Sequence, residues 1–79
     1  MKKIKICVIG LGYIGLPLTL KLSKKYNVVG YDISHKRIRD LKNNQDHTNE
    51  VKKKELLNSK VLFTNKSSNI KDCNFFIIT

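Results

Sequence analysis

Three glycines in the pattern G-x-G-x-x-G, with an acidic residue about 20 positions beyond them, are the residues here best suited to bind a charged ligand. The glycines are Gly10, Gly12 and Gly15, and the acid is Asp32. Gly10 permits a tight turn, because a residue without a Cβ atom tolerates positive φ. Gly12 lets the backbone approach a pyrophosphate closely, and Gly15 lets a following helix lie against a sheet. The pattern predicts a phosphate-binding turn.

The context of this turn indicates which ligand it would bind. Apolar segments precede the glycines and lead into Asp32, so the order is strand, glycine turn, helix, strand and acid. That order is typical of a dinucleotide-binding βαβ unit, in which the first helical amides and the helix dipole face the phosphates. A carboxylate at Asp32 would accept hydrogen bonds from the adenosine ribose and repel a 2′-phosphate. We therefore expect NAD rather than NADP; the alternative is a glycine turn without a ligand.

Strand and helix patterns alternate along the whole chain. Predicted strands span residues 3–9, 28–32, 61–64 and 74–79, and predicted helices span residues 12 or 13 to 25, 34–42 and 50–58. Ser34 is the expected N-cap of the second helix, and Ser67 or Ser68 that of a brief helical turn through residue 72. This alternation predicts an α/β fold, a Rossmann-type parallel sheet with flanking helices and strand order 3-2-1-4.

Length limits the chain to one small domain. A complete dinucleotide domain needs nearly twice these 79 residues, and the sequence ends on an apolar strand pattern. We expect residues 1–79 to be the N-terminal part of an NAD-binding domain whose other half, substrate region and catalytic region lie outside it. In the second predicted helix, Ile38 and Leu41 should face the core, with Lys36, Arg37 and Arg39 facing solvent.

Composition excludes several other functions. The net charge of +10 comes from scattered lysines, which favours a solvated surface over nucleic-acid binding. No segment has transmembrane length, and no signal peptide is recognisable, so we expect no membrane partner and a cytoplasmic protein. Cys7 and Cys73 lie in apolar strand contexts and predict neither a metal motif nor a disulfide. His35 and His47 have no partners at metal-binding spacing, so no metal site is expected.

Several segments together resemble one enzyme family. Residues 10–17, 30–33 and 36–38 are similar to the start of the UDP-glucose/GDP-mannose dehydrogenases. Leu16-Pro17 and residues 46–51 are most similar to the branch that acts on UDP-N-acetylhexosamines (GlcNAc or GalNAc). The resemblance implies oxidation of the sugar C6 alcohol to a uronic acid by NAD, through a thiohemiacetal and a thioester on a cysteine. It also implies a UDP-sugar substrate, a homo-oligomer and a role in surface polysaccharide biosynthesis, such as capsule.

The resemblance assigns roles to a few residues of this chain. Tyr13 and Ile14 would lie at the pyrophosphate turn, Asp32 at the adenosine ribose and Arg37 beside the adenosine phosphate or ribose. From the sequence alone, Arg37 is equally well a solvated helix residue, and Tyr13 a plain packing residue. Glu50 would border the sugar-nucleotide site or act as a helix N-terminal acid. The family's catalytic groups correspond to positions beyond residue 79, so no catalytic residue is expected here.

The sequence therefore leaves two classes of function open. The favoured one is the NAD-binding part of a UDP-N-acetylhexosamine 6-dehydrogenase, with UDP-glucose and then GDP-mannose as alternative substrates. The other is a non-catalytic Rossmann module that binds NAD without hydride transfer, because fold alone does not determine function.

Overall fold

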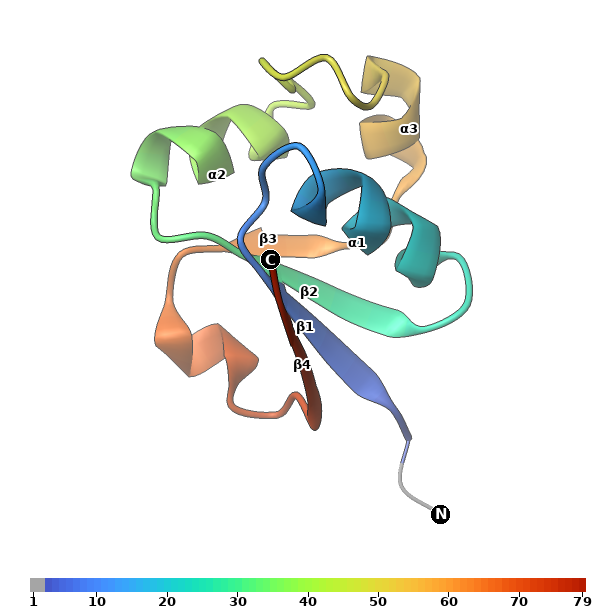
Figure 1. Ribbon diagram of the computed structural model, residues 1–79, viewed down its shortest axis with the longest axis vertical. Coiled ribbons are helices and arrows are strands. Elements are labelled where there is room, and N and C mark those ends of the chain that lie inside the picture. Colours follow the sequence, from blue (N-terminus) through green and yellow to red (C-terminus); the bar gives the residue numbers. More distant parts are fainter. Residues whose placement is uncertain (1–2) are drawn as a thin grey trace.

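The computed structural model describes residues 3–79, and within them a single parallel sheet carries helices on both faces (Figure 1). Its elements follow in the order β1 (Lys5–Ile9), α1 (Gly15–Ser23), β2 (Asn27–Tyr31), α2 (His35–Lys42), α3 (Lys53–Asn58), β3 (Leu62–Thr64), the 3-10 helix η1 (Ser67–Ile70) and β4 (Phe75–Ile78). The strand order is β3-β2-β1-β4, which confirms the predicted Rossmann-type topology.

The register of the sheet sets which side chains reach each face. Val8 of β1 pairs with Gly30 of β2 and Ile77 of β4, whereas Cys7 pairs with Val29 and Phe76. Because successive strand residues point to opposite faces, two separate cores form. The larger lies beneath α1, α2 and α3 and contains Ile6, Val8, Leu11, Leu16, Leu20, Val28, Ile38, Leu41, Val51, Leu56 and Phe63.

The second face of the sheet is thinly covered. Its buried cluster comprises Cys7, Val29 and Cys73, with Ile70 of η1 packed against it. Phe76 of β4 belongs to this face by register and is still 49% exposed. Both cysteines are buried free thiols, in keeping with their expected role as small apolar residues.

Helix boundaries differ from the sequence expectations for local reasons. α1 begins at Gly15 rather than 12 or 13, and α3 begins at Lys53 rather than 50. The backbone amides of Glu50 and Val51 donate to the carboxylate of Asp46, which holds them outside the helix. The expectation that Ser67 or Ser68 caps the last turn is wrong, because η1 begins at Ser67 and has no side-chain cap.

Around α2, two expectations are confirmed and one is wrong. Ser34 is the N-cap, and its hydroxyl accepts a hydrogen bond from the Arg37 amide at 3.1 Å. Ile38 and Leu41 face the core as expected. Arg37 does not face solvent: it is buried, because its guanidinium turns inward and finds acceptors beneath the glycine turn.

We expect Gly15→Ala to lower the free energy of unfolding by about 3 kcal/mol, because the added Cβ atom would overlap the carbonyl oxygen of Gly10. Gly12→Ala is the matched control: nothing lies within 4 Å of its Cβ position, and stability should stay unchanged or rise by up to about 1 kcal/mol. Urea denaturation compares the two variants. Equal losses of stability would contradict the packing role of Gly15.

Candidate cofactor site

The link between β1 and α1 is a tight turn that needs glycine at its first position. Gly10 has φ +96°, a conformation that side chains rarely allow. Its amide donates to the carbonyl oxygen of Tyr31 at 2.8 Å, which ties the turn to the end of β2. A Cβ atom here would lie 2.8 Å from the carbonyl oxygen of Thr79. The turn is therefore fixed between the ends of β2 and β4.

The next part of the turn faces open space. No heavy atom lies within 4 Å of a Cβ atom built at Gly12, and the side chains of Tyr13 and Ile14 are 67% and 74% exposed. Ile14 is the N-cap of α1 and gives no side-chain cap, and the first turn of α1 carries no acid. Within residues 3–79, the amides of residues 12–15 donate no hydrogen bond. A helix N-terminus with free amides beside an open backbone fits a phosphate group.

Asp32 lies at the carboxyl end of β2, next to this turn. One of its oxygens accepts from the Leu11 amide and the other from the Ser34 amide, both at 2.9 Å. A carboxylate offers about four lone-pair positions, so each oxygen can accept a further hydrogen bond. The side chain is thus fixed in place and still able to receive two hydroxyl groups.

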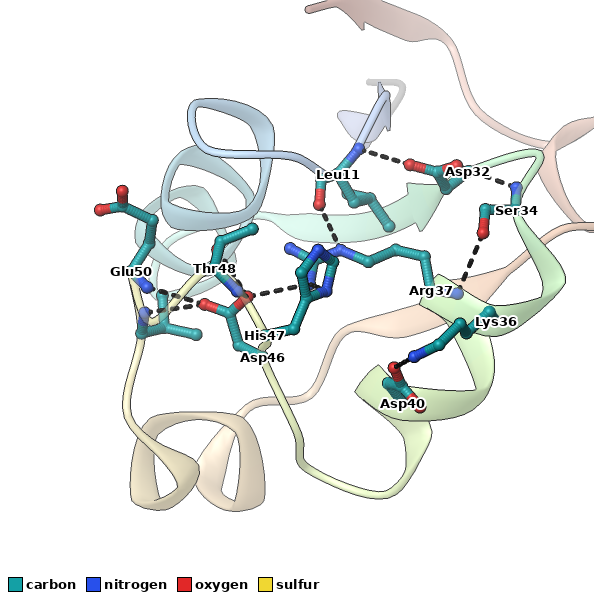
Figure 2. A network of polar contacts seen from close by, with 11 residues as sticks. Leu11, Asp32, Ser34, Lys36, Arg37, Asp40, Asp46, His47, Thr48 and Glu50 are labelled. Carbon is teal, nitrogen blue, oxygen red and sulfur yellow. Dashed lines mark hydrogen bonds and ion pairs between the residues drawn. The ribbon is translucent and has the colours of Figure 1, made fainter.

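Arg37 lies beneath the turn rather than on the surface (Figure 2). It is 6% exposed, and its Nε donates to the carbonyl oxygen of Leu11 at 2.6 Å. Its Nη1 donates to Asp46 at 2.8 Å and lies 3.2 Å from Nδ1 of His47. Its Nη2 is buried without a hydrogen-bond partner in the described residues. The interpretation of Arg37 as a solvated helix residue is wrong.

Asp46 organises the loop that follows α2. Its carboxylate accepts from the Arg37 guanidinium, from the amide and hydroxyl of Thr48, and from the amides of Glu50 and Val51. Burial by itself would raise the pKa of Asp46, but the hydrogen bonds from Thr48, Arg37 and Val51 hold it well below its ordinary value. The carboxylate is therefore ionised opposite the Arg37 cation.

The site contains groups that sequence reasoning did not assign. Asp46 lies in residues 46–51, which the sequence relates only to one branch of the family; an aspartate side chain often accepts from the backbone amide two residues on, and this Asx-turn tendency is the signal that could have marked it. Thr79 also reaches the turn, since its hydroxyl donates to the Gly10 carbonyl oxygen at 2.7 Å. Glu50 and His47 have exposed side chains.

The described part of the chain contains neither a metal-binding cluster nor a membrane-spanning helix. Residues 3–79 contain no group of three or more His, Cys, Asp or Glu side chains placed to hold a metal ion. Among the same residues, no helix has both the length and the apolar character needed to cross a membrane.

Known proteins resemble this chain along nearly its whole length. Residues 4–79 match the model of the UDP-glucose/GDP-mannose dehydrogenase family, NAD binding domain. UDP-N-acetyl-D-glucosamine 6-dehydrogenase of Salmonella typhi is 47% identical over 98% of the chain and 18% of its own length. Protein CapL of Staphylococcus aureus is 44% identical over 92% of the chain and 17% of its own length.

A solved structure agrees with these sequence relatives. UDP-D-ManNAc dehydrogenase from Pyrococcus horikoshii superposes with a TM-score of 0.85 and 36% identity, over 96% of this chain and 20% of that one. The chain thus spans about a fifth of the length of the relatives it matches. It belongs to the UDP-glucose/GDP-mannose dehydrogenase family, and its residues are those of the family's NAD-binding domain.

Proposed function

We propose that this chain supplies the NAD-binding part of a UDP-N-acetylhexosamine 6-dehydrogenase. The observation that carries the proposal is the open turn at Gly12, where free amides at the start of α1 lie next to the fixed carboxylate of Asp32. A pyrophosphate and an adenosine ribose need these two features side by side. When bound, NAD supplies the hydride acceptor for alcohol oxidation.

Each residue of the turn has a separate task in this proposal. Gly10 makes the turn, Gly12 leaves room for the pyrophosphate, and the amides of Tyr13, Ile14 and Gly15 donate to its oxygens. Asp32 accepts hydrogen bonds from the ribose hydroxyls with the acceptor positions that Leu11 and Ser34 leave free. Arg37 belongs to the site through its bond to Leu11, and a direct contact with the cofactor stays a prediction.

The substrate assignment rests on the relatives. Those from Salmonella typhi and Pseudomonas aeruginosa are named UDP-N-acetyl-D-glucosamine 6-dehydrogenase, with 47% and 45% identity. We propose that the complete protein oxidises the C6 alcohol of such a sugar nucleotide to the carboxylate, with two hydride transfers, for a surface polysaccharide such as capsule. A cytoplasmic location and a homo-oligomeric assembly complete the proposal.

Asp32→Asn should lower the ratio of NAD affinity to NADP affinity by about tenfold, because it removes the like charge that a 2′-phosphate would meet. Titration of both cofactors measures the ratio. Asp72→Asn removes the same charge from an exposed position after η1, just before β4, and should leave the ratio unchanged. Comparable affinities for NAD and NADP in the unmodified protein would contradict the role given to Asp32.

The complete gene product should reduce NAD with UDP-N-acetylglucosamine or UDP-N-acetylgalactosamine and form the uronic acid, at a higher kcat/KM than with UDP-glucose. NADH absorbance measures the rate of NAD reduction with each sugar nucleotide, and mass analysis of the sugar nucleotide identifies the uronic acid. Faster turnover of UDP-glucose would favour the first alternative substrate. NAD binding with no turnover of any of these sugars would favour the non-catalytic module.

A further inference from the structure

The two cysteines of this chain meet in the buried cluster on the second face of the sheet. Cys7 belongs to β1 and is fully buried, while Cys73 lies between η1 and β4 and is 7% exposed. They share this cluster with Val29 of β2, and both are free thiols. The proposed function uses neither of them. Two thiols that the fold brings together from distant segments are the starting point for a disulfide.

Backbone contacts hold the segment that carries Cys73 against β1. The Asn74 amide donates to the Lys5 carbonyl oxygen, and the Lys5 amide donates to Oδ1 of Asn74, both at 2.9 Å. The Cys73 amide donates to the carbonyl oxygen of Ile70 at 3.1 Å, which ties it to the end of η1. Because alternate strand residues share a face, Lys5 and Cys7 point to the same side of the sheet. The residue next to Asn74 is therefore held close to Cys7.

The two thiols are near enough to affect each other's ionisation. Burial, followed by the adjacent Cys73 thiol, raises the pKa of Cys7 to about 11. Burial also raises the pKa of Cys73, but the charge of Lys5 and a hydrogen bond with Cys7 offset part of that rise. Cys73 is thus the less buried thiol and the one beside a cation. Because the thiolate is the attacking form in thiol–disulfide exchange, Cys73 is the better placed to react first.

We propose that Cys7 and Cys73 are a redox-sensitive dithiol, which a small disulfide oxidant converts into a disulfide that joins β1 to the segment before β4. The Cys73 thiolate attacks one sulfur of the oxidant, which forms a mixed disulfide and releases the first thiolate. Cys7 then loses its proton and displaces the second half of the oxidant, closing the bond between the two cysteines. Two protein thiols are oxidised to one disulfide, and the oxidant is reduced to two thiols that take up the two protons.

The bond would enclose the candidate cofactor site in one covalent loop. The segment between the two cysteines contains the glycine turn, α1, Asp32 and α2. Cross-linking its ends lowers the entropy of the unfolded chain, so the oxidised form should resist denaturation better than the dithiol. The cross-link also secures a face of the sheet that few apolar side chains cover, since Phe76 beside Cys7 is half exposed. This effect does not depend on NAD or on the role of Asp32.

Oxidised glutathione, added to the folded complete gene product, tests the pair. After the remaining thiols are alkylated in denaturant, trypsin cleavage at Lys5 and Lys71 places the two cysteines in different peptides. Mass analysis should find these two peptides joined in the oxidised protein and separate after treatment with dithiothreitol. The urea midpoint of the oxidised protein should be higher by about 1 M and should return on reduction.

The order of attack gives each single variant a different product. Cys7→Ala keeps the first thiol without its partner, so the reaction should stop at a glutathione adduct on Cys73. Cys73→Ala leaves only the fully buried thiol, which should take up at least about tenfold less glutathione in the same time. Neither variant should show the rise in urea midpoint.

Several results would overturn the proposal. Peptides of Cys7 and Cys73 that stay separate in the oxidised protein contradict the pair, as does a bond from either cysteine to another molecule of the protein. A joined pair without a higher urea midpoint contradicts the stabilising cross-link. Equal glutathione uptake by the two variants contradicts the order of attack. Peptide mapping of the unmodified protein needs no substitution, so it decides on the pair even if a variant does not fold.

Discussion

The backbone of Leu11 is the point on which the candidate site depends, because side chains of opposite charge hold its two polar groups. Asp32 accepts from the amide and Arg37 donates to the carbonyl oxygen. These bonds fix the turn between Gly10 and Gly12 from below, while the outer side of Gly12 remains open. A rigid backbone with one open side is what the close approach of a pyrophosphate requires.

The sheet makes this arrangement possible by bringing distant residues to one edge. All four strands are parallel, so the ends of β1, β2 and β4 meet where α1 begins. Gly15 allows α1 to start against the Gly10 carbonyl, and Thr79 donates to the same carbonyl from the end of β4. Ligands of parallel α/β sheets bind at this carboxyl edge, in agreement with the family that the chain belongs to.

The sequence predicted those parts of the fold that depend on local pattern. Alternating apolar segments identified the four strands and their order, and Ser34 identified the start of α2. It did not predict the burial of Arg37, since a helical arginine normally faces water and its two acceptors lie 26 and 9 positions away. Nor did it predict that Asp46 draws the amides before α3 away from that helix. Long-range hydrogen bonds of this kind do not depend on the spacing of apolar residues, so the hydrophobic periodicity of the sequence does not reveal them.

The central claim is that the open backbone at Gly12 receives the pyrophosphate of NAD, and calorimetric titration of NAD into Gly12→Val tests it most directly. Nothing in the described chain lies within 4 Å of the added Cβ atom, so the free energy of unfolding should stay within about 1 kcal/mol of the unmodified value. The account predicts that the folded variant gives no measurable NAD binding. Unchanged NAD affinity in that variant would contradict it.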